Sequence, residues 1–317
     1  MSEQSNNQGR AYEYICLTTL YNEISKLRGA EIEHNSAYNA AFHAWSLISP
    51  LLQNVLTESA KAAVATIFDM EPMIVERSDD LLKLKIQTDI EGRGGDVRDI
   101  VISLKNVQWE IGLSIKHNHF AVKHSRLAKS LDFGQKWFNI PCSDEYWSKV
   151  RPIFDYLKIQ KDDELNWSDL PHKDKDVYIP LLQSFMDEIK RSNSMNSEVP
   201  KRMVEYLLGE FDFYKVISID SRRITQIQTY NLHGKLNQAG KTLKPKIAVP
   251  IACLPSRIVS LEFKPNSTNT VELYMDGGWQ FSFRIHNAST KVETSLKFDI
   301  QIVGMPTTII SIDCKWN

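Results

Sequence analysis

Two apolar runs separated by a short polar segment constrain this chain more than any other feature of its sequence. The runs cover residues 97–104 and 109–116. This pattern is typical of a β-hairpin, so we expect two antiparallel strands. Asp99 lies near the start of the first run and Lys116 at the end of the second, so the hairpin would place a carboxylate beside an ammonium group. Such an arrangement suits metal-assisted attack on a phosphate, and it also occurs as a purely structural ion pair.

The periodicity of apolar residues predicts a mixture of helices and strands along the rest of the chain. Three- and four-residue spacing predicts helices over residues 10–27, 36–48, 56–68, 124–131, 180–190 and 201–208. Alternation and short apolar runs predict further strands over residues 81–88, 215–219, 223–230, 259–263, 270–275, 279–285, 296–303 and 308–313. Glycine predicts turns at 92–95 and 276–278, and a basic loop covers 234–246.

Composition excludes several classes of protein. The chain has 317 residues, 42% of them apolar and 24% charged, which is typical of a globular protein with a sizeable core. No run approaches the ~18 apolar residues of a membrane span, and the N-terminus does not resemble a signal peptide. The four cysteines are widely spaced, which fits reduced thiols better than a disulfide or zinc framework. We therefore expect a cytoplasmic protein without membrane contact.

Positive charge is concentrated in the last third of the chain, although the net charge is only −1. Residues 215–317 contain 13 Lys and Arg against 7 Asp and Glu, whereas the remainder contains 25 against 32. A basic C-terminal third favours a polyanionic partner. A charged, solvated face would give the same count.

Four long stretches carry a resemblance to a known family. They are GRAYEYICL (9–17), GDVRDI (95–100), WEIGLSIKHNHFAVKHSRL (109–127) and GGWQFSFRIHNASTKVE (277–293). On these residues the chain resembles type II restriction endonucleases of the HaeIII family, which have a PD-(D/E)xK nuclease core. The resemblance implies Mg²⁺-dependent hydrolysis of both strands of duplex DNA at 5′-GGCC-3′, leaving 5′-phosphates. It also implies a cognate DNA methyltransferase as a functional partner, not as a stable subunit.

The expected fold class is α/β (α+β), with a mixed-sheet restriction-endonuclease-like core. An N-terminal helical region, residues 1–75, would pack on a nuclease core at 76–160. A helical linker region, 161–212, would lead to a β-rich DNA-recognition region at 213–317.

The expected catalytic motif departs from the family pattern at one position. Asp99 would bind the metal and Lys116 would assist the attacking water, but the usual acidic-x-Lys ending is here Ser114-Ile115-Lys116. If the turn centres on residues 106–107, Asp99 lies opposite Ser114. The nearest carboxylate, Glu110, is then about 13 Å along the strand, which makes it a less suitable ligand unless the strand bulges.

Glu13 is the preferred substitute for the missing carboxylate. A core helix of nucleases that resemble this chain often presents a glutamate to the site, although Glu13 can equally be a solvated helix charge. Asp96 is a weaker candidate because its position in the strand points it away from Asp99. Ser114 would hold a metal-bound water, and the Ile115 carbonyl would ligate the ion.

Basic and polar residues after the hairpin predict contacts with the DNA backbone. No acid occurs between Glu110 and Asp132, so we expect phosphate contacts that add salt-dependent affinity without reading sequence. The candidates are Lys123, Arg126 and Lys129, with Asn118 and His119 at the strand exit. The letters His-Asn-His at 117–119 do not form an HNH motif, which spreads over a ββα unit, and a metal chelate there is disfavoured.

Base reading is expected from the C-terminal region. In residues 279–286, four apolar side chains alternate with Gln280, Ser282, Arg284 and His286, so one strand face would pack and the other would be open to DNA. Guanine presents O6 and N7 to a basic side chain, and cytosine presents an N4 donor. The candidates are Arg284, His286, Asn287 and Lys291, with Glu293 or Asp299 as acceptors for cytosine; each can also be a solvated position.

Two other functions compete with an endonuclease. The Ser-x-Lys departure favours a sequence-specific DNA-binding protein with a degenerate nuclease core. Pro141-Cys142 resembles the nucleophile of cytosine methyltransferases, but no glycine-rich cofactor loop accompanies it. The oligomeric state stays open.

Overall fold

The chain forms two compact units in the computed structural model, which describes residues 3–88, 96–119, 123 and 125–316. The first unit consists of Met1–Phe120, Gly209–Cys253 and Thr307–Asn317, and the second of Ala121–Leu208 and Leu254–Pro306. The fold mixes helices with a mixed sheet, as the sequence predicted. The strand-rich part of the chain after Gly209 is divided between the two units, and does not form one continuous region.

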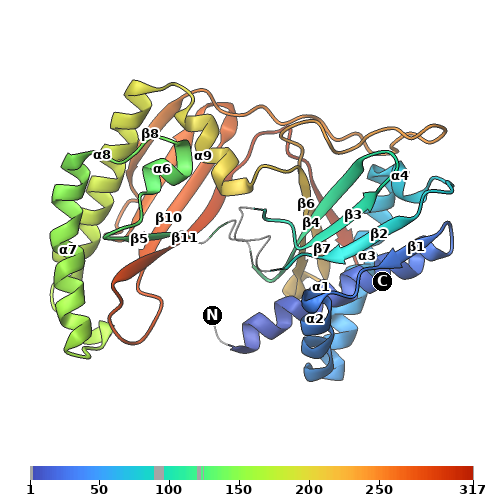
Figure 1. Cartoon of the computed structure of the whole chain (residues 1–317), viewed down its shortest axis with the longest axis horizontal. Coiled ribbons are helices and arrows are strands. Elements are labelled where there is room, and N and C mark those ends of the chain that lie inside the picture. Colours follow the sequence, from blue (N-terminus) through green and yellow to red (C-terminus); the bar gives the residue numbers. More distant parts are fainter. Residues whose placement is uncertain (1–2, 89–95, 120–122, 124, 317) are drawn as a thin grey trace. The chain divides into compact units, whose positions relative to one another are not determined.

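A seven-stranded mixed sheet is the centre of the first unit (Figure 1). Its order is β1-β2-β3-β4-β6-β7-β12. The strands are β1 (Ala30–Ile32), β2 (Leu82–Ile86), β3 (Ile100–Leu104), β4 (Trp109–His117), β6 (Phe213–Ile219), β7 (Ile224–Tyr230) and β12 (Ser311–Lys315). The pairs β1–β2 and β4–β6 are parallel, whereas all other neighbours are antiparallel. The predicted hairpin is therefore confirmed as β3–β4, in the middle of the sheet.

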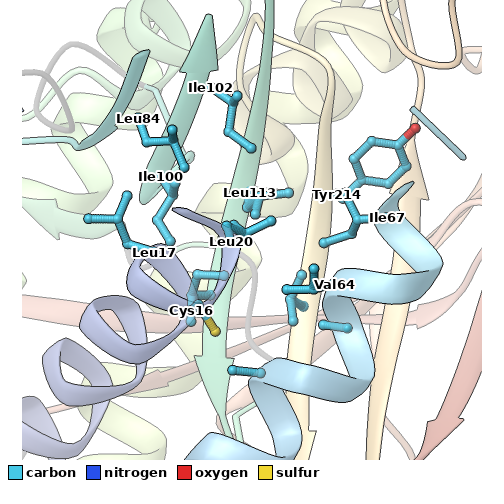
Figure 2. Close-up of a cluster of buried hydrophobic side chains, with 14 of the residues drawn as sticks. Cys16, Leu17, Leu20, Val64, Ile67, Leu84, Ile100, Ile102, Leu113 and Tyr214 are labelled. Carbon is cyan, nitrogen blue, oxygen red and sulfur yellow. The ribbon is translucent and has the colours of Figure 1, made fainter. Parts of the chain in front are cut away.

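Helices cover one face of this sheet and bury the core of the first unit. They are α1 (Glu3–Ser25), α2 (Ser36–Leu47), α3 (Pro50–Met70) and the short α4 (Pro72–Val75). Figure 2 shows Leu17 and Leu20 of α1 and Val64 and Ile67 of α3 facing apolar side chains of the strands. Alternate residues of β3 and β4 supply that sheet face: Ile100, Ile102, Leu104, Ile111, Leu113 and Ile115 are all at most 3% exposed. Strand alternation leaves the polar positions of the hairpin on the opposite face.

A long loop after β7 is anchored by acidic side chains of the first unit. Glu76 accepts hydrogen bonds from the backbone of Lys241, Thr242 and Leu243. Asp212 accepts from the backbone of residues 232, 233 and 235. These bonds replace the regular ladder that a strand would provide, and so they hold the basic loop in one conformation.

Glu71 anchors the same loop from a buried position. Its carboxylate accepts hydrogen bonds from the Tyr214 hydroxyl, at 2.5 Å, and from the backbone N–H of Asn237, at 2.6 Å. Burial raises the pKa of Glu71 to about 7, against the lowering effect of these two bonds. The pKa of Glu76 is lowered to about 2, because the Thr242 hydroxyl and backbone N–H groups donate to it.

The second unit is a five-stranded antiparallel sheet with helices on one face (Figure 1). The strand order is β5-β11-β10-β9-β8. The strands are β5 (Arg126–Ala128), β8 (Ile258–Phe263), β9 (Thr270–Met275), β10 (Gln280–His286) and β11 (Ser295–Gly304), and the helices are α6 (Phe133–Phe138), α7 (Asp144–Asp162), α8 (Ile179–Met195) and α9 (Val199–Leu208). Aromatic side chains fill the space between the layers: the Phe185 ring lies 5.0 Å from that of Phe298, and Trp137 lies 5.9 Å from Phe283.

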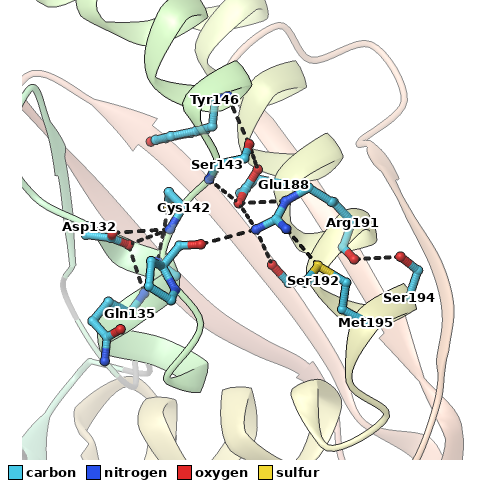
Figure 3. A network of polar contacts seen from close by, with 12 residues as sticks. Asp132, Gln135, Cys142, Ser143, Tyr146, Glu188, Arg191, Ser192, Ser194 and Met195 are labelled. Atoms are coloured by element: carbon cyan, nitrogen blue, oxygen red, sulfur yellow. Dashed lines mark hydrogen bonds and ion pairs between the residues drawn. The ribbon is translucent and has the colours of Figure 1, made fainter.

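A buried acid organises the helices of the second unit (Figure 3). Glu188, only 3% exposed, accepts hydrogen bonds from the backbone and hydroxyl of Ser143 and pairs with Arg191 at 2.6 Å. Ser143 in turn caps α7 by accepting from the Tyr146 N–H. The network therefore ties the start of α7 to α8 and gives the buried carboxylate a full set of partners.

Most predicted elements are confirmed, and two local predictions were wrong. The helix predicted over residues 124–131 is wrong in its described part: Arg126–Ala128 is an edge strand paired with β11, because burial of Leu127 in the sheet outweighs local helix propensity. Helix α7 was missed, since Pro152 lies inside it and its composition is highly charged. The turn expected at 92–95 lies outside the described residues.

Among the helices that the structure describes, none has both the length and the apolar character required to cross a membrane.

The two loop-anchoring glutamates are expected to affect stability with opposite pH dependence. The folded-state pKa of Glu71 is raised, so Glu71 binds its proton in the folded protein before it does in the unfolded chain. The free energy of unfolding therefore increases as the pH falls from about 7 to about 4.5. Glu71→Gln should therefore be more stable than the wild type at about pH 8 and similar to it at about pH 5, as measured by urea unfolding. Parallel pH curves for the two proteins would contradict this assignment.

Glu76→Gln provides the matched contrast on the same loop. The lowered pKa of Glu76 stabilises the fold above about 4.5, and that contribution is lost as the pH falls toward about 2. The variant should therefore be less stable than the wild type at neutral pH, and the difference should shrink in acid.

Candidate active site

The register of the β3–β4 hairpin places Asp99 opposite Ser114. Ile100 pairs with Leu113, and the ladder continues to Leu104 opposite Trp109. One step beyond, the Asp99 N–H donates to the Leu113 carbonyl at 2.8 Å. This is the register that the sequence predicted from a turn at residues 106–107.

The Asp99 carboxylate receives its hydrogen bonds on one oxygen. Oδ2 accepts from the Ile115 N–H at 2.6 Å, from Lys116 Nζ at 2.8 Å and from Ser114 Oγ at 3.3 Å. Oδ1 accepts none from the part of the chain that the structure describes. The Asp99 side chain is 23% exposed and that of Lys116 27%. Within the described residues, one carboxylate oxygen thus fixes the lysine and the other accepts no hydrogen bond.

Lys116 is held in its charged form. Burial lowers its pKa, but the charge of Asp99, the hydrogen bond to it and the charge of Glu13 outweigh that effect, so the pKa is raised. A lysine kept cationic in this way can stabilise negative charge on a phosphate. The Ser114 hydroxyl beside it adds a neutral donor and acceptor in place of a carboxylate.

Glu13 reaches the same neighbourhood from α1. The adjacent Tyr12 is buried, with its ring 6.4 Å from that of His117 at the end of β4. Its hydroxyl is fixed by Ser59 at 2.6 Å. This packing sets the middle of α1 against the end of β4 that carries Lys116, close enough for the charge of Glu13 to act on the lysine.

Glu110 and Asp96 both have another partner. Arg98 donates to Glu110 at 2.8 Å and to Asp96 at 2.8 Å. Its aliphatic stem crosses β4 over Gly112, where an added Cβ would lie 1.9 Å from the Arg98 Cδ. Gly112 therefore makes room for an arginine that holds these two carboxylates away from Asp99.

Lys215 is a residue that sequence reasoning missed. It lies on β6 in register with Ser114, while Lys116 pairs with Ile217. The side chain is only 3% exposed. Burial and, to a smaller extent, the charge of Lys116 lower its pKa to about 7, against the opposing effect of Asp99. The sequence feature that could have identified it is a lysine inside the otherwise apolar run FYKVISI, residues 213–219.

The strand exit after Lys116 is held by Asp220. His117 Nε2 lies 2.7 Å from Asp220 Oδ2, and Asn118 Nδ2 donates to the same oxygen at 3.1 Å. The Asp220 N–H donates back to the Asn118 side chain at 3.0 Å. These contacts join the ends of β4 and β6, with His119 next along the chain.

The basic residues expected to contact the DNA backbone lie in the second unit with partners of their own. Lys123 donates to the Tyr206 carbonyl at 2.6 Å and lies over the Tyr206 ring. Arg126 bonds Ser295 at 2.8 Å and lies 3.4 Å from Glu293. Lys129 pairs with Asp155 at 2.5 Å in an exposed position.

The residues that follow β10 form a loop that is held by side-chain hydrogen bonds. The Asn287 amide donates to the carbonyls of Ser289 and Lys291 and accepts from the Glu293 N–H. Lys291 Nζ donates to the Glu164 carbonyl at 2.5 Å. These side chains therefore have structural contacts, which the sequence left open as an alternative.

The alternation predicted for β10 is confirmed. Trp279, Phe281, Phe283 and Ile285 are all fully buried. Arg284 is exposed on the other face and lies 3.3 Å from Asp299 on β11. On the same face, His286 is in register with Lys297 of β11, and Lys297 is in register with Arg126 of β5. Three basic side chains thus form a row across neighbouring strands.

Lys297 completes this basic row and was not identified from the sequence. Burial and the charge of Arg126 lower its pKa, against Asp299 and Glu293. Within the described residues it forms no ion pair. The pKa of His286 is lowered as well, by burial and by the charges of Arg284 and Lys297. An anion lying on this face would relieve the mutual repulsion.

The donor set around Asp99 fits a hard divalent cation. Mg²⁺ prefers oxygen ligands, takes one or two carboxylates from a protein and retains several waters. Asp99 Oδ1 accepts no hydrogen bond from the described residues, and the Glu13 carboxylate and Ile115 carbonyl are the further oxygens expected from the sequence. No cluster of three or more His, Cys, Asp or Glu side chains suited to a metal occurs in the described residues, so water and substrate oxygens would complete such a site.

Comparison with known proteins gives one consistent result. The chain matches the family described as HaeIII restriction endonuclease over residues 9–306. It is 51% identical over 318 residues to the type II restriction enzyme HaeIII from Haemophilus aegyptius, with 100% of both chains covered. No solved structure matches significantly. This chain belongs to the HaeIII restriction endonuclease family.

Proposed function

We propose that this protein is a type II restriction endonuclease that cleaves both strands of duplex DNA at 5′-GGCC-3′ and leaves 5′-phosphates. The observation that carries the proposal is the contact of Asp99 with Lys116 across the hairpin, in a chain of this family. The relative at 51% identity is named as a type II restriction enzyme. The core would then be of the PD-(D/E)xK type, acting in the cytoplasm.

The proposed reaction assigns a separate task to each residue of the site. A bound Mg²⁺ would supply Lewis-acid stabilisation and an activated water. Asp99, through Oδ1, and Glu13 would hold the ion together with the Ile115 carbonyl. Lys116 would orient the attacking water and stabilise the charge that develops on the phosphate. Ser114 would position a water through its hydroxyl.

Specific binding would come from the second unit. The open face of β10 and β11 offers Arg284 and His286 to base edges or phosphates, with Lys297 in the same row. Asn287 and Lys291 would contribute from the following loop. Lys123, Arg126 and Lys129, and Asn118 and His119 near the cleavage site, would bind the backbone.

Two further parts of the proposal concern biological context. A cognate DNA methyltransferase would protect the host sites, as a functional partner and not a subunit. One site per chain must cut two strands, which requires a symmetric dimer or sequential nicking. A DNA-binding protein with a degenerate core is the competing function, favoured by Ser114 in place of an acid. Binding to plasmid without nicking in the presence of Mg²⁺ would support that alternative.

Removal of either partner of the Asp99–Lys116 pair should abolish cleavage without abolishing DNA binding. We expect Asp99→Ala and Lys116→Ala to slow plasmid cleavage by about 100-fold or more, because each group acts on the reacting phosphate. Binding to a GGCC duplex, measured by fluorescence anisotropy with Ca²⁺, should change little.

Glu110→Gln is the matched control on the same strand. Its carboxylate contacts Arg98 and not Asp99, so cleavage should stay close to the wild-type rate. Normal cutting by Asp99→Ala or Lys116→Ala would place the active site elsewhere.

Lys297→Ala should weaken binding to DNA of any sequence. If Lys297 contacts one phosphate, the slope of log Kobs against log salt should fall by about 1 in magnitude. Lys149→Ala is the control, since this lysine is paired with Glu145 on α7. A change confined to the GGCC duplex would instead indicate base reading by Lys297.

A further inference from the structure

Lys116 lies one residue before the point where its strand ends. β4 is in register with β6 as far as His117 opposite Ser218, and the Asn118 N–H donates to the Ser218 carbonyl at 2.8 Å. Asn118 then leaves the sheet with a φ of 50°, in the left-handed region. The ends of an element open more readily than its middle. The position of the Lys116 ammonium beside Asp99 therefore depends on what holds this strand end.

Asp220, in the turn between β6 and β7, contacts this strand end with its side chain. Its Oδ2 accepts from His117 Nε2 at 2.7 Å and from Asn118 Nδ2 at 3.1 Å. Its Oδ1 accepts from the Ser218 hydroxyl at 2.8 Å. The Asp220 N–H donates in the other direction, to Asn118 Oδ1 at 3.0 Å. Asp220 and Asn118 are thus joined by two hydrogen bonds of opposite direction.

A role within its own turn does not account for the Asp220 side chain. Aspartate is common in turns because its carboxylate can accept from the backbone two residues further on. Here the turn is closed by the backbone, with the Arg223 N–H donating to the Asp220 carbonyl at 3.1 Å. In the part of the chain that the structure describes, the carboxylate accepts from no N–H of that turn. Its donors belong instead to His117, Asn118 and Ser218.

His117 also packs against helix α1. Its side chain is 8% exposed, and its ring lies 6.4 Å from the buried ring of Tyr12. Because a carboxylate only accepts, His117 donates to Asp220 through Nε2. Loss of the carboxylate would leave this shielded N–H without its acceptor, which favours opening of the strand end.

We propose that Asp220 is a positioning residue for cleavage: its hydrogen bonds keep the end of β4 closed, so that Lys116 stays in place beside Asp99. The inference rests on the proposed function of the Asp99–Lys116 pair. Asp220 acts through the backbone of β4 and through His117, so its hydrogen bonds matter and its negative charge does not. A ligand for the metal would require the charge, which separates the two roles.

Asp220→Asn and Asp220→Ala distinguish hydrogen bonding from charge. An asparagine can turn its carbonyl oxygen toward His117 and Asn118 and donate its amide to the Ser218 hydroxyl, which also accepts. We therefore expect Asp220→Asn to cleave plasmid with a kcat close to that of the wild type. Asp220→Ala should lower kcat by about tenfold, since a small displacement of a catalytic group is enough for such a loss. KM and Ca²⁺-supported binding to a GGCC duplex should change less than kcat.

Asp313→Ala is the matched control for loss of an acid near the same turn. Asp313 accepts from Arg222 and from Gln226, each at 2.9 Å, but it lies on β12, which β6 and β7 separate from β4. This variant should leave kcat unchanged. Equal loss of kcat in Asp220→Asn and Asp220→Ala would show that the charge is required and would overturn the proposal. A wild-type kcat in Asp220→Ala would overturn it as well.

Amide hydrogen exchange gives a readout that does not depend on cleavage. In Asp220→Ala the amides of Ile115 and Asn118 should exchange faster by about tenfold, because the strand end opens more often. Asp220→Asn should match the wild type, and the amides of α3 should be unchanged in both variants. Unchanged exchange at Ile115 and Asn118 in Asp220→Ala would overturn the proposal, as would faster exchange throughout α3. Failure of the wild type to cut DNA would instead refute the proposed function, and the exchange comparison would still decide whether Asp220 holds the strand end.

Discussion

The hydrogen-bonded contact between Asp99 and Lys116 depends on the register of a single strand pair. Ile100 opposite Leu113 puts three donors around one carboxylate oxygen and turns the apolar side chains toward α1 and α3. A slip by one residue would exchange the two faces, so that apolar groups met solvent and Asp99 entered the core. Hydrophobic burial on one face of the sheet therefore fixes the polar geometry on the other.

The same face separates its charges into two groups. Arg98 holds Glu110 and Asp96 in an ion-pair network, and Gly112 provides the space for its stem. Asp99 remains with lysines as its charged neighbours on the sheet. A site with few carboxylates of its own depends more on lysine charge to stabilise a phosphate, which fits Ser114 at the position of the usual acid.

In the second unit, aromatic and charged side chains lie on opposite faces of the sheet. Its aromatic residues are collected on one face of the sheet, where Trp137, Phe185 and Phe298 fill the space below the helices. The other face is left with basic groups such as Arg126 and Lys297, and burial together with the charge of Arg126 lowers the pKa of Lys297. An antiparallel sheet covered on one side only is suited to such a division between packing and binding.

The sequence alone determined the hairpin, its register and the positions of Asp99 and Lys116, because alternation and turn position are local properties. It also predicted that Glu110 lies well along the strand from Asp99, and the register places Glu110 opposite Ser103. Only the tertiary structure decided what depends on neighbours distant in sequence. The parallel pairing of β4 with β6 brings Lys215 beside Ser114, and pairing with β11 turns Arg126–Ala128 into a strand. Parallel pairing joins segments about a hundred residues apart, so no local pattern in the sequence can encode it.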